Sequence, residues 1–408
     1  MMSSFMAKLL QLASLLTARR VRFHAFALAL CLWSAYAWEM SAPGLRDRNG
    51  LIKGTDFLHF YTLGKLALTG RGDLLYDIRG QGALIHTLLP QTTGTFYVPL
   101  YGPQVSLLFS PFARLSYGWA LLLWLVLNAS IYCWCCYAVW KTCPNLAGYG
   151  LIVFFLAIAF PGFFHLIAWG QSSGLALVLF TLAYFALEAK HPFLVGLAIG
   201  SLVFKPQLGL AAAFVFVFSQ QWKVVLGAVT AAAAQLAVGW MRYGTAVMQT
   251  YFHSLLHVRE VLRWLEPRPY QMHSLRAFWS LLVPWPPAAL ALYLASALIV
   301  IITTLRVWRS DAPLHLRFSS LLLATVLISP HLTVYDLVIL APAFLWLGDW
   351  ALRHSVSPDS LKQSQLTQLL LYLAFPLFLL GPLAMVTHLQ LSVIVLAALH
   401  YKINAGRA

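Results

Sequence analysis

Asp56 is a carboxylate at the start of a short helical pattern, and His59 follows it three residues later on the same helical face. A carboxylate in this place can act as a general base toward a hydroxyl group. An ordinary N-cap, in which the side chain accepts a hydrogen bond from the first turn of the helix, is the alternative interpretation. The residues alone leave both possibilities open.

Lys205 interrupts two apolar segments and is followed by Pro206 and Gln207. An ionisable side chain at membrane depth costs about 2.5–3.5 kcal/mol on insertion scales. Such residues are therefore candidates for function. We expect Lys205 to pair with an anionic group such as a phosphate. The alternative is a lysine whose long side chain extends to the membrane surface.

His331 follows Ser329 and Pro330, where an apolar helix is expected to begin. Tyr335 lies four residues later on the same helical face, and Asp336 is the next residue. A helix N-terminus attracts anions, and His331 would strengthen such a site. The alternative is a histidine that hydrogen-bonds a backbone carbonyl.

Gln171 stands beside Trp169 at the expected end of another helix. Its amide can hydrogen-bond a sugar hydroxyl while the indole packs on the sugar ring, or it can cap the helix expected over 171–189. The remaining acidic residues of the polar stretches are expected to be structural. Asp73 and Asp77 should be solvated or capping, and Glu260 and Glu266 should form loop ion pairs with their arginine neighbours Arg259, Arg263 and Arg268.

The composition defines the elements that must position these residues. Apolar residues make up 61% of the 408 residues and charged residues 10%, and the mean hydropathy is +0.76. Soluble proteins contain about 25% charged residues, so the chain is expected to be an all-α polytopic membrane protein. The net charge of +15 fits contact with anionic lipids and the excess of basic residues on the cytoplasmic side. No basic stripe indicates a nucleic-acid partner.

A span needs about 20 apolar residues, and the chain is expected to form about 12 spans (11–13) in a single membrane domain, residues 1–408. The candidate segments are 23–40, 97–116, 118–140, 150–168, 171–189, 192–204, 207–219, 222–241, 286–306, 315–329, 332–348, 365–386 and 389–402. Basic residues near the N-terminus and in the C-terminal tail place both termini in the cytoplasm, which requires an even number of spans. One segment must therefore not cross, and 97–116 or 150–168 is expected to be that segment.

Two polar stretches, 41–96 and 242–285, then lie outside the cell membrane as extracytoplasmic loops. The first is expected to contain two amphipathic helices, within 55–70 and 73–90, that lie in the plane of the lipid headgroups. The candidate residues consequently gather on the outer face. ATP is absent there, so an enzyme would need a donor that is already activated, such as a phosphate-linked lipid. One base and a set of phosphate-binding cations suffice for such a transfer, and no metal or other cofactor is required.

Six segments carry a family resemblance: GTDFLHFY, LLYD, FYVPLYGPQVSLLFSPFARL, IAWGQSSGLALVLFTLAY, GLAIGSLVFKPQLGL and SPHLTVYDLVILAP. In this order, over about residues 50–345, they resemble the polyprenyl-phosphate-dependent glycosyltransferases of family 87 in the GT-C superfamily. The resemblance implies a GT-C-like helix bundle in the inner (plasma) membrane with its site facing the periplasm. It also implies a hexosyltransferase that moves a sugar, most often mannose, from a polyprenyl-phosphate donor to a lipid or glycan acceptor with inversion.

Under this resemblance Asp56 is the catalytic base. The donor phosphate and sugar are bound by Lys205, His331, His59, Gln171, Tyr335 and Asp336. Two other functions are considered. A transporter or flippase of lipid-linked glycans would place polar residues along mid-membrane helices and often show repeats, whereas a glycan polymerase or ligase would use undecaprenyl-diphosphate substrates.

Overall fold

The computed structural model describes residues 2–90, 92, 94–266, 268–353 and 358–405. Within these residues the regular secondary structure is helical, and β-pairing is limited to the isolated bridges Arg46–Ile52 and Met272–Thr333. The expectation of an all-α protein is therefore confirmed.

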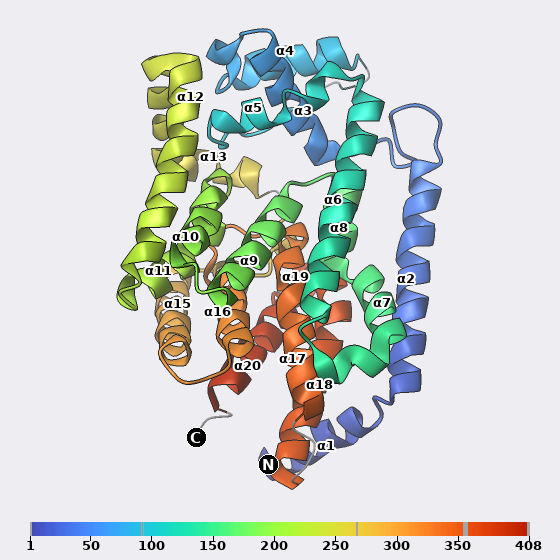
Figure 1. Cartoon of the computed structure of the whole chain (residues 1–408). Coiled ribbons are helices and arrows are strands. Elements are labelled where there is room, and N and C mark those ends of the chain that lie inside the picture. Colours follow the sequence, from blue (N-terminus) through green and yellow to red (C-terminus); the bar gives the residue numbers. More distant parts are fainter. Residues whose placement is uncertain (1, 91, 93, 267, 354–357, 406–408) are drawn as a thin grey trace.

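Long helices and several shorter ones together form the bundle (Figure 1). They are α2 (Ala18–Met40), α6 (Tyr117–Trp140), α7 (Gly150–Ala159), α8 (Pro161–Trp169), α9 (Ser173–Glu188), α10 (Pro192–Gly200), α11 (Leu210–Phe218), α12 (Trp222–Leu256), α15 (Pro286–Trp308), α16 (Leu314–Ile328), α17 (Ala341–Arg353), α18 (Pro358–Leu379) and α20 (Leu391–Ala405). Both termini lie at the lower end in Figure 1.

Shorter elements complete the fold. The helices are α1 (Met2–Ser14), α3 (Thr55–Leu68), α4 (Ile78–Leu88), α5 (Gln104–Phe109), α13 (Val258–Leu265), α14 (Leu275–Leu282) and α19 (Ala384–Thr387). The 3₁₀ segments are η1 (Gly72–Leu74), η2 (Phe112–Arg114), η3 (Pro144–Tyr149), η4 (Ser201–Phe204), η5 (Pro206–Gly209), η6 (Pro269–Gln271), η7 (Val334–Leu340) and η8 (Gly381–Leu383). Of these, α3, α4 and α5 form a layer at the upper end of the bundle (Figure 1).

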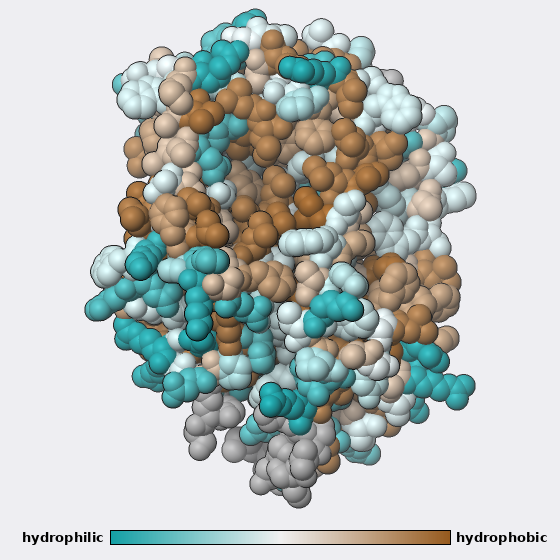
Figure 2. All heavy atoms as spheres, in the orientation of Figure 1, coloured by the Kyte–Doolittle hydropathy of each residue, from teal (hydrophilic) through white to brown (hydrophobic). Residues whose placement is uncertain are grey.

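Four helices among the described residues are long and apolar enough to cross a membrane, and six spans result if each of two bent helix pairs is counted as one. Five shorter apolar helices accompany them. The protein is thus an all-α membrane protein, but length and apolarity alone do not reach the expected count of about 12. Figure 2 shows hydrophobic side chains across the middle and upper part of one face, with hydrophilic side chains gathered mainly toward the lower end.

The segment 97–116 does not form a long helix. It contains only the six-residue α5 and the three-residue η2, and Pro103 and Pro111 directly precede these two elements. A helix rises 1.5 Å per residue, so α5 covers about 9 Å, far short of the ~30 Å hydrocarbon core. The segment 150–168, by contrast, forms α7 and α8 with a bend of 43° at Phe160.

Helix α3 differs from the amphipathic surface helix expected over 55–70. Most of its residues are buried, from Phe57 to Ala67, because α5, η2 and α6 pack against it and α4 also contacts it. Helix α3 is therefore a buried helix and not the amphipathic surface helix expected, and its position in the headgroup plane stays a prediction. Its polar residues face the protein interior, which is what makes Asp56 and His59 available to a site inside the molecule.

The stretch 242–285 is also more helical than a loop. Helix α12 continues to Leu256 across a break at Gly244, whose φ of 79° is outside the helical region. Helices α13 and α14 follow, with η6 between them. This arrangement brings Glu266 and Gln271 to a cavity that α3 also lines.

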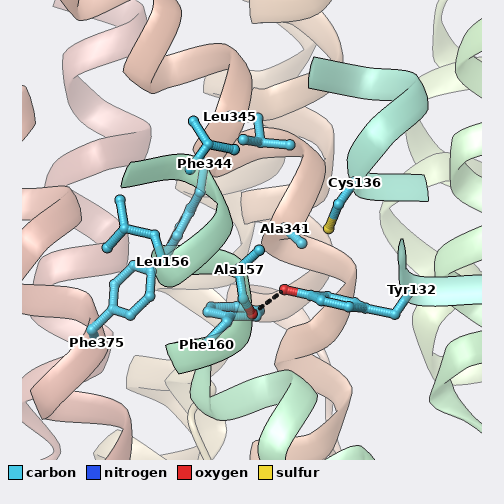
Figure 3. Close-up of a pocket in the computed structure, with 10 residues that line it drawn as sticks. Tyr132, Cys136, Leu156, Ala157, Phe160, Ala341, Phe344, Leu345 and Phe375 are labelled. Carbon is cyan, nitrogen blue, oxygen red and sulfur yellow. Dashed lines mark hydrogen bonds between the residues drawn. The ribbon is translucent and has the colours of Figure 1, made fainter. Parts of the chain in front are cut away.

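A second, small cavity of about 70 Å³ lies between α6, α7, α17 and α18. Figure 3 shows apolar side chains around it and the Tyr132 hydroxyl donating to the carbonyl oxygen of Ala157, at 2.8 Å. Among the residues that the structure describes, no charged one lines this cavity. It offers no group for acid–base or phosphate chemistry, so the candidate site must lie elsewhere.

Candidate active site

The first turn of α3 presents Asp56. Gly54 precedes the helix with φ 68°, a conformation that favours glycine, and a Cβ atom there would lie 2.4 Å from Leu121 Cδ1. The Thr55 hydroxyl donates to the carbonyl oxygen of Ile52 at 2.9 Å. Neither Thr55 nor Asp56 makes a side-chain capping bond. The N-cap interpretation of Asp56 is therefore wrong, and its carboxylate is left for another purpose.

The turn between α8 and α9 brings Gln171 to Asp56. Gly170 ends α8 with φ 68°, and a Cβ atom there would lie 2.8 Å from the Cβ of Phe57. This close approach places the turn directly against the start of α3. Gln171 Nε2 then donates to Asp56 Oδ2 at 2.7 Å. The helix α9 begins at Ser173, and Gln171 Oε1 accepts from the Ser172 amide at 3.0 Å.

Lys205 stands between η4 and η5 in a non-helical conformation, with φ −135° and ψ 68°. The following Pro206 disfavours a helical residue before it, which explains the break in the apolar hairpin. The Lys205 ammonium group donates to Asp336 Oδ1 at 2.8 Å, to Ser173 Oγ at 2.9 Å and to Gln171 Oε1 at 3.2 Å. Its side chain is only 4% exposed, so it does not extend to the membrane surface.

Asp336 anchors this cluster from η7. Its Oδ2 accepts from the backbone amide and the hydroxyl of Thr333, at 3.2 and 3.3 Å. The bond from the Thr333 amide and the reciprocal bond from the Asp336 amide to the Thr333 side chain form a capping box. Asp336 Oδ1 accepts from Ser173 Oγ at 2.6 Å as well as from Lys205. Both carboxylate oxygens are thus engaged with the protein.

A large cavity of about 630 Å³ opens in front of Asp56. Among the sequence-predicted residues, those that line it are Asp56, His59, Gln171, His331 and Tyr335. Lys205 and Asp336 are not lining residues and lie behind the wall that Gln171 and Tyr335 form. The structure therefore brings all seven residues together, but it separates five that can meet a substrate from two that support them.

His331 reaches the cavity from the segment before η7. Its Nδ1 lies 2.9 Å from Glu266 Oε1, and Glu266 also pairs with Arg276. The β-bridge between Met272 and Thr333 holds the two segments side by side. Glu266 was expected as a loop ion pair with nearby arginines; its partners are instead residues distant from it along the chain or in a later helix. Its position on the cavity wall was missed, because nothing in the sequence links residue 266 to residue 331.

Aromatic rings cover part of the cavity wall. Tyr335 lies 5.6 Å from Trp169, measured between ring centroids, and the Lys205 ammonium lies 4.9 Å from the Tyr335 ring. His59 sits near Tyr97 and Tyr101, at 4.9 and 5.7 Å between ring centroids. Aromatic faces of this kind pack against apolar surfaces of a ligand while polar atoms at their rims fix its orientation.

The environment of α3 shifts the acid–base properties of its two candidates. Burial raises the pKa of Asp56 to about 6, although the Gln171 hydrogen bond and the charge of Lys205 act in the opposite direction. Burial lowers the pKa of His59 to about 3. Near neutral pH Asp56 is therefore a carboxylate able to take up a proton, whereas His59 is a neutral imidazole.

Two other acidic residues behave as expected from the sequence. Asp77 caps α4 by accepting from the Arg79 amide at 2.9 Å, and Asp73 forms an exposed ion pair with Arg71. Within the described ranges no group of three or more His, Cys, Asp or Glu side chains is placed to hold a metal ion.

The fold and the site define a class of protein: an all-helical membrane protein whose cavity is lined by ionisable side chains and lies under a layer of short helices. The model of glycosyltransferase family 87 matches residues 100–330, more than half of the chain. The chain therefore belongs to glycosyltransferase family 87 and is a glycosyltransferase. The matched range includes Gln171 and Lys205 but ends just before His331 and begins after Asp56. Comparisons with curated proteins and with solved structures found no match.

Proposed function

We propose that the protein transfers a sugar, mannose, from a polyprenyl-phosphate donor to a hydroxyl group of a lipid or glycan acceptor. The single observation that supports this best is the half-buried Asp56 on the wall of a cavity shared with His331. Gln171 holds Asp56 Oδ2. Within the described residues, Asp56 Oδ1 accepts no hydrogen bond, so this oxygen is available to an incoming hydroxyl.

The reaction follows from that arrangement. Asp56 takes the proton of the acceptor hydroxyl as the acceptor oxygen attacks the anomeric carbon. The bond from that carbon to the phosphate oxygen breaks, and its electron pair leaves with polyprenyl phosphate. Attack opposite the leaving group inverts the anomeric centre. The proton remains on Asp56 until it is released to solvent.

The donor end of the cavity lies at His331 in this proposal. Its Nδ1 donates to Glu266 Oε1, so in this proposal the ring also carries a hydrogen on Nε2 and donates it to a phosphate oxygen. Tyr335 and Trp169 are close enough to form an aromatic wall for the sugar ring. The role of Lys205 in binding phosphate stays a prediction, to which the structure adds that its ammonium group already has protein acceptors.

The decisive experiment replaces Asp56 with Asn. We expect transfer of radiolabelled mannose from polyprenyl-phosphate mannose to membrane lipids to fall by about 10²–10⁴-fold, while binding of the donor stays measurable. Retained turnover would refute the assignment of the base. If another polyprenyl-phosphate sugar supports turnover instead, the donor sugar is corrected and the role of Asp56 is tested with it.

The rival functions differ in what they release. A transporter or flippase would form no glycosidic bond, and membership of a glycosyltransferase family favours a transferase. A polymerase or ligase would release undecaprenyl diphosphate rather than a polyprenyl monophosphate. Mass spectrometry of the lipid product separates these two outcomes.

We also propose that the shorter apolar helices cross the plasma membrane, so that about 12 crossings place the cavity outside. Twelve candidate spans among the described residues support this proposal: α2, α6, the bent α7–α8 pair, α9, α10, α11, α12, α15, α16, α17, α18 and α20. An even number of crossings agrees with both termini at one end of the molecule (Figure 1). The cavity lies at the other end, where 41–96 and 242–285 contribute to it. In a chain with the exposed Cys31 and Cys133 replaced by Ser, R79C should be labelled from outside and K141C from the cytoplasm. The reverse labelling would overturn this orientation.

A further inference from the structure

Gln171 has an amide orientation that its neighbours determine. The atom assigned as Oε1 lies 3.0 Å from the Ser172 amide and 3.2 Å from the Lys205 ammonium, and both of these groups only donate hydrogen bonds. The amide cannot be flipped without placing two N–H groups against two donors. The NH₂ group therefore has to face Asp56 Oδ2, at 2.7 Å.

Lys205 is not available to a substrate. An ammonium group has three N–H bonds, and here Asp336 Oδ1, Ser173 Oγ and Gln171 Oε1 accept from it. The side chain is 4% exposed and lies outside the cavity wall. A donor phosphate could reach it only by displacing the carboxylate of Asp336, which the capping box holds in place.

The chain of contacts ends on the carboxylate that the proposed function makes the base. Asp336 fixes Lys205, Lys205 fixes the Gln171 carbonyl, and the Gln171 amide holds Asp56 Oδ2. The other oxygen of Asp56 is then aimed by the protein rather than by the substrate. A hydrogen bond to the charged form of a carboxylate also favours that form, which opposes the effect of burial on Asp56.

We propose that Gln171 and Lys205 are positioning residues for the base: Lys205, anchored by Asp336, sets the Gln171 amide so that it orients and keeps charged the carboxylate of Asp56. The inference rests on the proposed function of Asp56. It assigns Lys205 and Gln171 to the acceptor half of the reaction instead of to donor binding.

The pH dependence of turnover distinguishes these two roles. Asp56 must be deprotonated to act as a base, so kcat should be high above its pKa of about 6 and fall as the pH drops below it. Besides Lys205 and Asp336, the ionisable groups that interact electrostatically with Asp56 are Tyr97, Tyr101, Tyr117 and Tyr335. The other ionisable residues that line the same cavity are Tyr36, Glu39, Asp47, His59, Glu266, Arg268 and His331. Burial raises the pKa of Tyr97 and Tyr101 and lowers that of His59 to about 3, so these three do not titrate near pH 6.

The experiment measures kcat, the KM for the donor and the pH profile of Gln171→Leu and Gln171→Glu with radiolabelled polyprenyl-phosphate mannose and membrane lipid extract. We expect kcat of Gln171→Leu to fall by about 10- to 100-fold, as for a small misplacement of a reacting group, with the donor KM unchanged. The acid limb should move to higher pH because the carboxylate loses its hydrogen bond. Gln171→Glu should move it further, since two carboxylates at this distance cannot both ionise.

A matched control is Gln81→Leu, which makes the same change at a buried glutamine of α4 bonded only to the backbone of Leu74 and Leu75. It should leave the acid limb in place even if it lowers the melting temperature. The double variant Lys205→Met/Asp336→Leu removes the anchor without leaving a buried charge. This double variant should also move the acid limb of the kcat profile to higher pH, but by less than Gln171→Leu does.

A raised donor KM with an unmoved acid limb in the Gln171 variants would overturn the proposal in favour of donor binding. A pH profile of the double variant that matches the unaltered protein would also overturn it. The result for Asp56→Asn distinguishes failure of the positioning role from failure of the proposed function. If Asp56→Asn is inactive and the Gln171 profile is normal, only the positioning role fails; if Asp56→Asn is active, the proposed function itself fails.

Discussion

Two pairs of a basic side chain and a carboxylate lie at the site, one behind the cavity wall and one on it, and they differ in how many of their hydrogen-bonding atoms the protein already uses. The Lys205–Asp336 pair, at 2.8 Å, has side chains that are 4% and 2% exposed. The His331–Glu266 pair, at 2.9 Å, has side chains that are 22% and 8% exposed. Every donor of Lys205 has a protein acceptor, whereas within the described residues His331 Nε2 has none.

The difference teaches that charge alone does not identify the group that meets an anionic substrate. A basic side chain can bind a ligand when it lies on the wall of the cavity and keeps a hydrogen-bonding atom without a protein partner, and among the described residues His331 meets both conditions. Lys205 meets neither. The Lys205–Asp336 contact thus supports the site from behind the cavity wall, whereas the His331–Glu266 contact leaves His331 accessible to a ligand.

The largest effect should come from breaking the buried pair. Asp336→Asn leaves the Lys205 ammonium buried without its counter-charge, and the loss of one partner of such a pair costs about 3–5 kcal/mol. We expect the free energy of unfolding in detergent, measured by titration with SDS, to fall by about that amount. The double variant Lys205→Met/Asp336→Leu should recover most of the loss.

Asp73→Asn is the matched control, because it breaks the exposed pair with Arg71, whose side chains are 55% and 60% exposed. Its unfolding should match that of the unaltered protein. Equal stability of Asp336→Asn and the unaltered protein would mean that the pair is not closed to water as the structure has it.

Local features of the site follow from the sequence, whereas its assembly does not. The break at Lys205–Pro206 and the helical face shared by Asp56 and His59 are visible in residue types and spacing, because they depend on neighbours within one turn. The contact between Asp56 and Gln171 depends on Gly170 packing against α3. No local rule encodes that meeting of distant segments.

The position of α3 shows the same limit. Its mixed polar and apolar pattern is typical of a helix at a membrane surface, but α5 and η2 cover the face expected to meet water. Glu266 was likewise expected to pair with neighbours in its loop and instead holds His331 and Arg276. In both cases partners far along the chain decide the environment.

A smaller effect should come from replacing His331, the member of the His331–Glu266 pair that lines the cavity. Replacing His331 with Gln removes a donor to the phosphate, and hydrogen bonds to charged groups contribute about 1.5–3 kcal/mol. We expect the KM for polyprenyl-phosphate mannose to rise by about tenfold or more, with little change in unfolding. His86→Gln, an exposed histidine of α4 outside the cavity, should leave the KM unchanged. A raised acceptor KM with a normal donor KM would instead move His331 to the acceptor side.

The smallest effect concerns His59, which is 5% exposed and lines the cavity, and whose two ring nitrogens have no hydrogen-bond partner among the described residues. An unsatisfied buried polar group costs about 1–3 kcal/mol, so a residue kept only for packing would be better replaced by an apolar ring. His59→Phe should therefore raise the melting temperature.

Because burial keeps His59 neutral, with a pKa of about 3, its partner is expected to be a hydroxyl and not a phosphate. The variant should raise the acceptor KM by about two- to tenfold, the value of a neutral hydrogen bond, with the donor KM unchanged. A stabilised variant with normal KM values for both substrates would make His59 a packing residue, and a raised donor KM would return it to the donor side with His331.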